Sequence, residues 1–447
     1  MNYAEALDFL ADLGLELWKA KLGLDAIVTL LQALGDPHQK YATAIVAGTN
    51  GKGSTAAILA SILQKAGHRT GLYTSPHLIR VNERIRVDDE EISDADFARC
   101  LTEARAVAER LFAQKQLAHL PSFFEYLTAV AFLHFAREGV SFAVLEVGMG
   151  GRLDATNVTR PRVAVITPVD IDHSEYLGTT RAAIAAEKAG VIKPGQTVVS
   201  ACENPEAAEV IRRRCQECDA DLIETFRFAQ LSNLRHSEGQ YSFDISLNGE
   251  VLTGLTSPLR GRFQVTNAVT GLIAAYQLAQ QGFHISRAAM AEGLRTASWP
   301  GRLEVLIPQP LVILDGAHNP AATREVAAFV REHLAGRRVR LVYASMRDKA
   351  IGEISRILFP LAEEVYLTRP AIERAAIAEE ILAAAEYPPR RVIVQPQPVR
   401  ALEEACQASA PEDVVLVTGS LYLAGTIKRA ILDGTLQLQK IARPAAG

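Results

Sequence analysis

The stretch Thr43-Ala-Ile-Val-Ala-Gly-Thr-Asn-Gly-Lys-Gly-Ser54 is a short apolar run that leads into a glycine-rich turn, and a helical pattern follows over 55–66. Glycines let backbone N–H groups surround a phosphate, while a lysine and a helix N-terminus supply positive charge. The stretch therefore predicts a strand, a nucleotide-binding loop and a helix. An extra glycine separates Lys52 from Ser54, so either Ser54 or Thr55 would reach a magnesium-bound phosphate. A turn without a ligand is the alternative reading. The expected ATP contacts in this loop are Thr49, Asn50, Gly51, Lys52, Gly53 and Ser54.

Apolar runs of strand length alternate with helical patterns along most of the chain, which is typical of a mostly parallel sheet covered by helices. We expect an α/β fold with an N-terminal P-loop ATPase domain over 1–297 and a smaller, Rossmann-like α/β domain over 298–447. Proline and glycine in Ala297-Ser-Trp-Pro-Gly interrupt both patterns and set that boundary. Residues 225–257 suggest an antiparallel excursion, and we expect a helix over 267–280. The expected strands are 43–47, 70–73, 142–147, 163–167 and 197–200, then 311–315, 339–343, 364–368, 392–394 and 413–418.

The composition of the 447 residues excludes several classes of protein. A net charge of -4 lacks the basic excess of a nucleic-acid binder. No apolar run approaches the ~20 residues of a membrane-spanning helix, and acidic residues precede the first lysine, so we expect a cytoplasmic protein without membrane or nucleic-acid partners. Five cysteines argue against a disulfide framework. Cys215 and Cys218 form an isolated pair at the end of a helical pattern, which is too few ligands for a structural zinc site.

Two further segments place charged or imidazole groups at strand ends. Glu146 ends the apolar run 142–147, and His173 follows the run 163–167 in Asp170-Ile-Asp172-His173. Because parallel strands bring their C-terminal ends to one edge of a sheet, we expect Glu146 and His173 to converge near the phosphate loop around a magnesium ion. A loop-tethering carboxylate and a histidine bonded to Asp170 or Asp172 are the structural alternatives.

Lys188 lies among alanines and isoleucine in the helical pattern from Arg181 to Ala189. A buried lysine is costly unless its charge is lowered or paired, and Glu187 cannot share its helical face. Composition alone favours a lysine that extends to solvent.

Several motifs together resemble the folylpolyglutamate synthase/dihydrofolate synthase family, a branch of the Mur ligase superfamily. The resemblance covers almost the whole chain, in the family's order. The motifs are the phosphate loop, Thr74-Ser-Pro-His-Leu-Ile-Arg-Val-Asn-Glu-Arg-Ile, Ser122-Phe-Phe-Glu-Tyr-Leu-Thr, Leu145-Glu-Val-Gly-Met-Gly-Gly-Arg-Leu-Asp-Ala-Thr-Asn, Asp172-His-Ser-Glu-Tyr-Leu-Gly, Glu187-Lys-Ala-Gly-Val-Ile-Lys, Pro300-Gly-Arg-Leu-Glu, Leu314-Asp-Gly-Ala-His-Asn-Pro and Thr418-Gly-Ser-Leu-Tyr-Leu-Ala-Gly.

The resemblance implies an ATP- and Mg²⁺-dependent amide ligase, in which a folate or dihydropteroate carboxylate is phosphorylated by ATP and then joined to L-glutamate. It implies a carbamate on Lys188, and a monomer. The implied catalytic residues are Lys52, Lys188, His173 and Arg302. The implied magnesium ligands are Ser75, Glu146 and His173, and the further ATP contacts are Asn267, Arg302, Asp315 and His318. The implied pterin-binding positions are Ser122, Phe123, Phe124, Glu125, Leu153, Asp154 and Ala155.

Two departures from the family pattern bear on the substrate. Ser122 stands where threonine is usual, which keeps the hydroxyl, and Lys19-Ala-Lys-Leu-Gly-Leu stands where many bifunctional members carry an acidic residue. The choice between folate and dihydropteroate therefore stays open at this point. Three alternatives remain as well: another Mur-type amino-acid ligase, a P-loop small-molecule kinase, and a nucleotide-binding regulator without catalysis.

Overall fold

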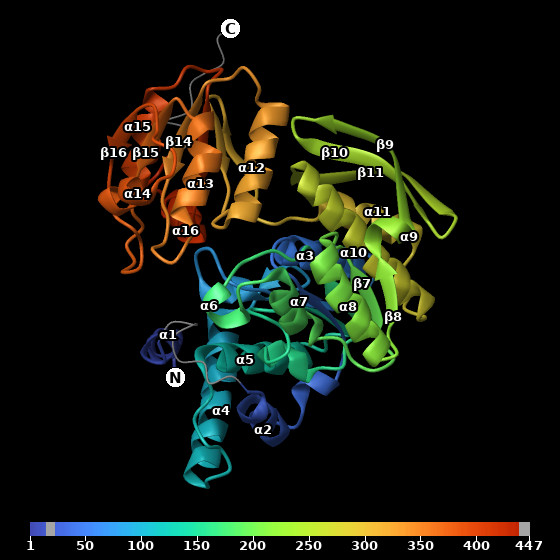
Figure 1. Ribbon diagram of the computed structural model, residues 1–447. Helices are drawn as coiled ribbons and strands as arrows, with labels where there is room; N and C mark the ends of the chain where they lie inside the picture. The colour runs from blue at the N-terminus through green and yellow to red at the C-terminus, as the bar shows by residue number, and fades with distance from the viewer. Residues whose placement is uncertain (15–22, 438–447) are drawn as a thin grey trace. The chain divides into compact units, whose positions relative to one another are not determined.

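The computed structural model describes residues 1–14 and 23–437, and Figure 1 shows its elements. Contacts divide the chain into two compact units. The first comprises 1–234, 242–257 and 266–298, and the second comprises 235–241, 258–265 and 299–447. The segments 235–241 and 258–265 thus belong with the C-terminal part. The expected division at 297/298 places both of them in the N-terminal domain.

The first unit is built on an eight-stranded sheet with the order β4-β3-β2-β5-β1-β6-β7-β8. Strands β2, β5, β1, β6, β7 and β8 are parallel to one another, and the short β3 and β4 continue the sheet with antiparallel pairs. The strands are β1 Ala42–Ala47, β2 Thr70–Tyr73, β3 Ile85–Val87, β4 Glu90–Glu91, β5 Phe142–Glu146, β6 Val163–Ile166, β7 Thr197–Ser200 and β8 Asp221–Glu224. The expected α/β class is confirmed, although the short β3, β4 and β8 were not anticipated.

The central strands bury both faces, since β5 and β6 are buried at every position and β1 at all but its first. Their neighbours in the sheet are fixed by the order β5-β1-β6, so the loops that follow these three strands meet at one edge. The helix α3 (Lys52–Lys65) covers β1, β2 and β5, and it starts three residues earlier than expected. Its N-terminus therefore opens directly onto the loop after β1.

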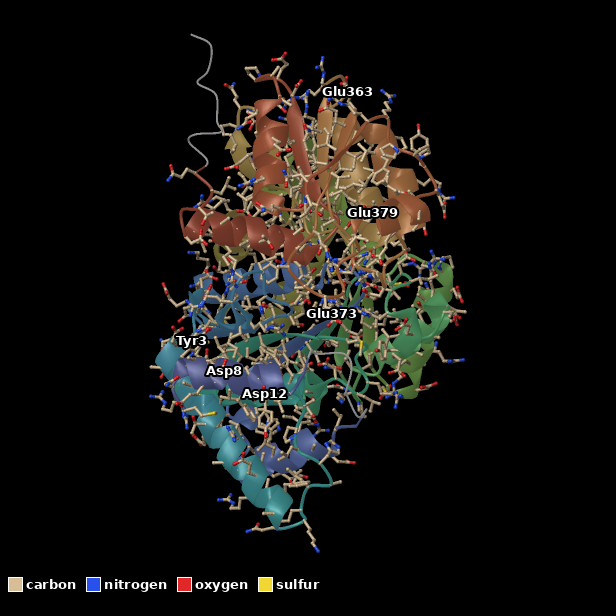
Figure 2. The ribbon with its side chains drawn as sticks, turned by 90° about the vertical axis from the view of Figure 1, so that its left-hand side faces the viewer. Tyr3, Asp8, Asp12, Glu363, Glu373 and Glu379 are labelled. Carbon is tan, nitrogen blue, oxygen red and sulfur yellow. The ribbon has the colours of Figure 1, made fainter. Side chains whose placement is uncertain are left out.

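Helices on the opposite side of this sheet form a separate apolar cluster. The cluster takes in β5 through Ala143 and Leu145, and helix α1 through Ala6 and Leu10. Asp8 of α1 (Figure 2) is exposed while Ala6 and Leu10 are buried, so α1 packs by one side only. The helices are α1 Tyr3–Asp12, α2 Asp25–Ala33, α4 Asp94–Ala113 and α5 Phe123–Arg137.

The expected excursion near residues 225–257 is a three-stranded sheet, β9 (Ala229–Ser237), β10 (Gln240–Leu247) and β11 (Glu250–Arg260). Two-residue turns at Glu238-Gly239 and Asn248-Gly249 join the strands, and all four residues have positive φ. Such turns match the twist of antiparallel strands. Gly261 then turns the chain with φ 96° into α10 (Arg262–Gln280), which begins five residues before the helix expected from the sequence.

The second unit contains a six-stranded sheet with the order β12-β13-β17-β14-β15-β16. All neighbouring pairs are parallel except β12 with β13, and β12 was not anticipated. The strands are β12 Glu304–Pro308, β13 Leu311–Leu314, β14 Val339–Tyr343, β15 Glu364–Leu367, β16 Val392–Val394 and β17 Val414–Thr418. The helices are α12 Pro320–His333, α13 Ile351–Leu358, α14 Ala378–Ala384, α15 Pro398–Gln407 and α16 Leu421–Leu432.

The remaining helices belong to the N-terminal part of the chain. They are α6 Ser174–Leu177, α7 Arg181–Ala189, α8 Pro205–Glu217, α9 Thr225–Phe228 and α11 Arg287–Thr296. Across residues 1–14 and 23–437, no helix has both the length and the apolar character needed to cross a membrane.

Candidate active site

The loop between β1 and α3 is shaped by two glycines. Gly48 has φ 145°, and a Cβ there would lie 1.8 Å from the Thr167 hydroxyl. Gly51 has φ 89°, and a Cβ there would lie 2.3 Å from Oδ1 of Asn267. Both positions therefore require glycine, because a side chain would be strained and would overlap its neighbour. The buried Asn267 comes from α10, so the structure brings this expected ATP contact to the phosphate loop.

Lys52 folds back over the loop that precedes it. Its Nζ donates hydrogen bonds to the carbonyl oxygens of Gly48 at 3.2 Å and Thr49 at 3.1 Å. The Thr49 hydroxyl donates to the Asp170 carbonyl at 2.9 Å, which ties the phosphate loop to the loop after β6. The lysine charge and the N–H groups of the first turn of α3 thus face the same place, as anion binding requires.

Lys188 reaches the same loop from α7. Its Nζ donates to the Gly48 carbonyl oxygen at 2.7 Å, and the residue is 4% exposed, so it does not extend to solvent as composition alone favours. Burial and the nearby charge of Lys52 lower the pKa of the Lys188 ammonium to about 7, although Asp172 and Asp154 act in the opposite direction. At neutral pH much of this lysine is therefore a free amine.

A pocket joins the loops that follow β1, β5 and β6. It brings together Lys52, His173 and Lys188, three of the four expected catalytic residues. Asp172 and Met149 also line it, and the sequence reasoning did not select either of them as a site residue. The sequence could have indicated both residues, because each lies within a motif that was already singled out. The pocket, about 270 Å³ with open solvent included, is lined by Gly48, Thr49, Lys52, Val147, Gly148, Met149, Gly150, Asp172, His173 and Lys188.

Two of the expected magnesium ligands are in direct contact. The Ser75 backbone N–H donates to Oε2 of Glu146 at 3.0 Å, and Glu146 is 4% exposed at the C-terminal end of β5. The third, His173, adopts a left-handed conformation with φ 51° at the start of α6. Its ring Nε2 lies 3.9 Å from the Asp172 carboxylate. This geometry is compatible with a histidine held by Asp172 and also with a metal ligand.

The loop from Gly148 to Ala155 is organised by Asp154. Its Oδ2 accepts the backbone N–H groups of Gly148 at 2.9 Å and Met149 at 3.1 Å, and its Oδ1 accepts from Thr156. Burial raises the pKa of this carboxyl against these hydrogen bonds. Asp154 therefore shapes the loop, and the neighbouring Leu153 is only partly buried.

Ser122 and Glu125 form a capping box at the start of α5. Oε2 of Glu125 accepts from both the backbone N–H and the hydroxyl of Ser122 at 2.8 Å. The rings of Phe123 and Phe124 follow, with the Arg84 guanidinium 5.6 Å from the Phe123 ring centre and the Phe124 ring against Gly148. A local structural role thus accounts for Ser122 and Glu125, while Phe124 connects this helix to the pocket wall.

Arg302, Asp315 and His318 lie together in the second unit. Asp315 follows β13, and its carboxylate accepts the N–H groups of Leu303 at 2.9 Å and Ala317 at 2.7 Å. Burial raises the pKa of Asp315, whereas the Arg302 charge lowers it. The Arg302 guanidinium lies against Gly316, and Nδ1 of His318 is 2.9 Å from the Gly316 carbonyl oxygen. The segment Lys19 to Leu22 lies outside the described residues.

Comparison with known proteins assigns the chain to a family. Residues 46–275 match the sequence profile described as Mur ligase middle domain, and residues 301–421 match that of the Mur ligase, glutamate ligase domain. A relative described as dihydrofolate synthase/folylpolyglutamate synthase, from Bacillus subtilis, is 35% identical over 413 residues, covering 92% of this chain and 95% of that protein. The chain belongs to the folylpolyglutamate synthase/dihydrofolate synthase family.

Solved structures of this family share the fold. The structure of Mycobacterium tuberculosis folylpolyglutamate synthase complexed with ADP has a TM-score of 0.89 at 32% identity, over 96% of this chain and 97% of that one. The Escherichia coli FolC structure in complex with DHPP and ADP has a TM-score of 0.86 at 29% identity, over 97% and 100%. The family is one of ATP-dependent glutamate ligases, which is the class expected from the phosphate loop and its accompanying motifs.

Proposed function

We propose that this chain joins L-glutamate to the carboxylate of a folate, and also of dihydropteroate, through an acyl phosphate made with ATP. The observation that carries the proposal is the convergence of Lys52, His173 and Lys188 on one pocket at the phosphate loop. Family membership supplies the substrate class, since the relatives carry both synthase names and one solved structure holds DHPP with ADP.

The first step brings two anions together, the substrate carboxylate and ATP, so positioning and charge neutralisation do most of the work. The backbone N–H groups from Gly51 to Ser54 and the Lys52 ammonium hold the phosphates, whereas the N–H groups of Thr49 and Asn50 donate to the Pro168 carbonyl oxygen. The carboxylate oxygen then bonds to the γ-phosphorus as the bond to ADP breaks. In the second step the glutamate amine attacks the acyl carbon, loses a proton and displaces inorganic phosphate.

The residues beside the pocket fit a magnesium ion. Glu146 and Ser75 are adjacent and offer oxygen donors, the kind that magnesium prefers, while His173 would complete the protein ligands. The Thr55 hydroxyl is buried without a hydrogen-bond partner among the described residues, which favours Thr55 as the group that reaches the phosphate-bound ion. Bound magnesium would neutralise charge on the phosphate oxygens.

Lys188 is suited to carbamylation. A free amine can attack carbon dioxide and release a proton, and the lowered pKa of Lys188 provides that amine at neutral pH. The product replaces a buried cation by an anion that can engage a metal. We expect protein equilibrated with ¹³C-bicarbonate to show a carbamate carbon signal by NMR that Lys188→Arg lacks. Equal spectra from both proteins would contradict the carbamate.

The assay that tests the proposed reaction measures phosphate release from ATP and Mg²⁺ in tubes that each contain one acceptor. Release that requires both L-glutamate and an acceptor supports the ligase, and release with dihydropteroate as well as tetrahydrofolate supports both activities. Release with tetrahydrofolate alone would leave only the chain-extending activity. Phosphate transfer that does not need glutamate would indicate a kinase, and no release with either acceptor would point to another Mur-type ligase. Lys52→Met serves as the inactive control.

We also place this reaction in the cytoplasm and on a monomer. The five cysteines are all free and buried, which suits a reducing compartment. All catalytic groups proposed here come from one chain. Size-exclusion chromatography with light scattering tests the monomer.

A further inference from the structure

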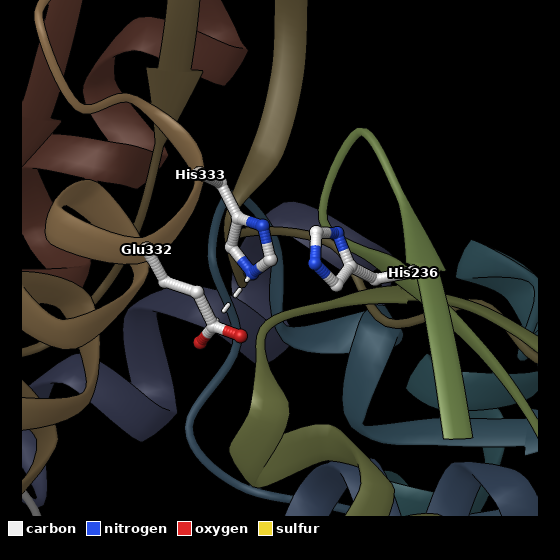
Figure 3. A group of neighbouring side chains, drawn as sticks. All are labelled: His236, Glu332 and His333. Carbon is white, nitrogen blue, oxygen red and sulfur yellow. Dashed lines mark ion pairs between the residues drawn. The ribbon is translucent and has the colours of Figure 1, made fainter. Parts of the chain in front are cut away.

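A cluster of metal-ligating side chains lies in the second unit, apart from the pocket described above. It consists of His236 near the end of β9, and Glu332 and His333 at the C-terminal end of α12. One ligand atom from each residue lies within 4.8 Å of those of the other two. Figure 3 shows the two imidazole rings facing one another, with the Glu332 carboxylate alongside His333.

The hairpin and the helix that carry these residues are packed closely. A Cβ at Gly239 in the β9–β10 turn would lie 2.4 Å from the Phe329 ring of α12, so the two backbones approach as only glycine allows. The His333 and Phe329 ring centres are 4.9 Å apart. Packing of this kind limits the freedom of the His333 side chain before any ligand arrives.

Tyr241 orients two members of the cluster. Its hydroxyl lies 3.0 Å from Oε1 of Glu332 and 3.0 Å from Nε2 of His333. The phenol donates to Oε1 of Glu332. This hydrogen bond orients the Glu332 carboxylate, whose Oε2 lies 3.7 Å from Nε2 of His333. These hydrogen bonds do not include His236, whose ring is T-shaped to His333 at 4.6 Å between centres.

We propose that His236, Glu332 and His333 bind a divalent transition-metal ion of the zinc class, which joins the β9–β10 turn to the C-terminal end of α12. Two imidazole nitrogens and a carboxylate oxygen are a common zinc ligand set, with the fourth position left to water. The C-terminal end of a helix also favours a cation.

The observed geometry is close to what such an ion requires. Bonds of 2.0–2.1 Å in a tetrahedral site place ligand atoms about 3.4 Å apart. The ligand atoms lie within 4.8 Å of one another, so each separation exceeds that value by at most roughly 1.4 Å, which small rotations of the exposed His236 and Glu332 side chains can close. Magnesium and calcium are poor candidates, because both prefer oxygen ligands.

The experiment uses the full chain, stripped of metal and then dialysed against limiting Zn²⁺ with excess Mg²⁺ to occupy the site near Glu146. Bound zinc is measured by mass spectrometry for wild type, His236→Gln and the control His119→Gln, whose histidine is also on the surface. We expect wild type and the control to retain one more zinc per chain than His236→Gln. The affinity of the cluster should fall by at least roughly tenfold, the smallest effect seen even for groups that only orient a ligand.

A second readout is thermal unfolding, because an ion that binds only the folded chain raises the melting temperature. Zn²⁺ should raise it for wild type and His119→Gln but not for His236→Gln, which is expected to fold because residue 236 is exposed. Equal zinc content in all three proteins, or a wild type that retains none, would overturn the proposal and leave a hydrogen-bonded cluster around Tyr241.

Discussion

Gly51 holds the phosphate loop in a shape that no other residue can reproduce. We expect Gly51→Ala to weaken ATP binding by roughly tenfold or more, because its methyl group would displace Asn267 as well as strain the backbone. Gly67→Ala is the matched control. Gly67 has the same φ of 89° with nothing within 4 Å of its Cβ, so only the backbone cost of about 1–2 kcal/mol applies. Isothermal titration with ATP would contradict this view if both variants bound ATP equally.

Lys188 should make stability depend on pH. Its pKa of about 7 in the folded chain lies below the ordinary value of 10.5, so between these pH values the unfolded chain binds the extra proton. The free energy of unfolding contributed by Lys188 therefore rises with pH, by about 1.4 kcal/mol per unit, and its burial is most costly below pH 7.

We expect Lys188→Met to be more stable than wild type at pH 6, with the difference shrinking from pH 7 toward pH 10. Denaturant unfolding at several pH values in CO₂-free buffer measures it. Parallel pH profiles for the two proteins would show that the lysine is not buried as a free amine.

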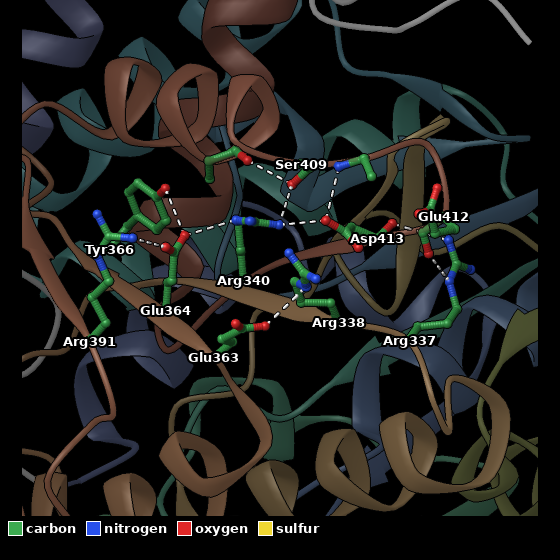
Figure 4. Close-up of polar contacts among 12 residues, drawn as sticks. Arg337, Arg338, Arg340, Glu363, Glu364, Tyr366, Arg391, Ser409, Glu412 and Asp413 are labelled. Carbon is green, nitrogen blue, oxygen red and sulfur yellow. Dashed lines mark hydrogen bonds and ion pairs between the residues drawn. The ribbon is translucent and has the colours of Figure 1, made fainter. Parts of the chain in front are cut away.

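At the scale of elements, one buried arginine connects three strands of the second sheet. Arg340 on β14 donates to Glu364 of β15 at 2.9 Å and to Asp413, just before β17, at 2.6 Å (Figure 4). All three side chains are less than a tenth exposed. We expect Arg340→Ala to lower the free energy of unfolding by about 3–5 kcal/mol, since it leaves two buried carboxylates without this partner.

The neighbouring pair Arg338 and Glu363 provides the control for that variant. Their side chains are 3.1 Å apart but more than half exposed, so water screens the interaction. Arg338→Ala should cost less than about 1 kcal/mol. Denaturant unfolding of the two variants that gave equal losses would mean that burial does not decide the strength of these pairs.

At the scale of the whole molecule, Arg302 belongs to the second unit while Lys52 and Lys188 belong to the first. The resemblance to the family implies that Arg302 contacts ATP, and we expect turnover to depend on its charge. Arg302→Ala should then lower kcat/KM by roughly 100–1,000-fold, as the loss of a group that stabilises transition-state charge does.

The same variant should unfold within about 1 kcal/mol of wild type, because Arg302 is only partly buried. Arg324→Ala, which removes an exposed arginine of the same unit, should change neither property. Steady-state kinetics and unfolding measured side by side test this, and near-normal turnover in Arg302→Ala would exclude this role for Arg302.

Local patterns predicted most of the fold. The strands 70–73, 197–200 and 339–343 lie where the apolar runs placed them, because buried parallel strands are apolar on both faces. The edge strand β4 was missed because it consists of two glutamates, which form no apolar run. The start of α10 was misplaced because Gly261 ends the preceding strand, and the apolar pattern does not show where that turn occurs.

The sequence by itself determined the strand β1, the phosphate loop and the helix α3, and it also determined the family to which these motifs belong. These features depend on glycine conformation and on the spacing of nearby residues. Only the tertiary structure decided that Lys188 meets the Gly48 carbonyl, 140 residues away, and that His236 faces His333. Both contacts arise where separate elements pack together, and burial there lowers the pKa values of Lys188 and His333. A contact between residues that are far apart in the sequence produces no periodic pattern in that sequence.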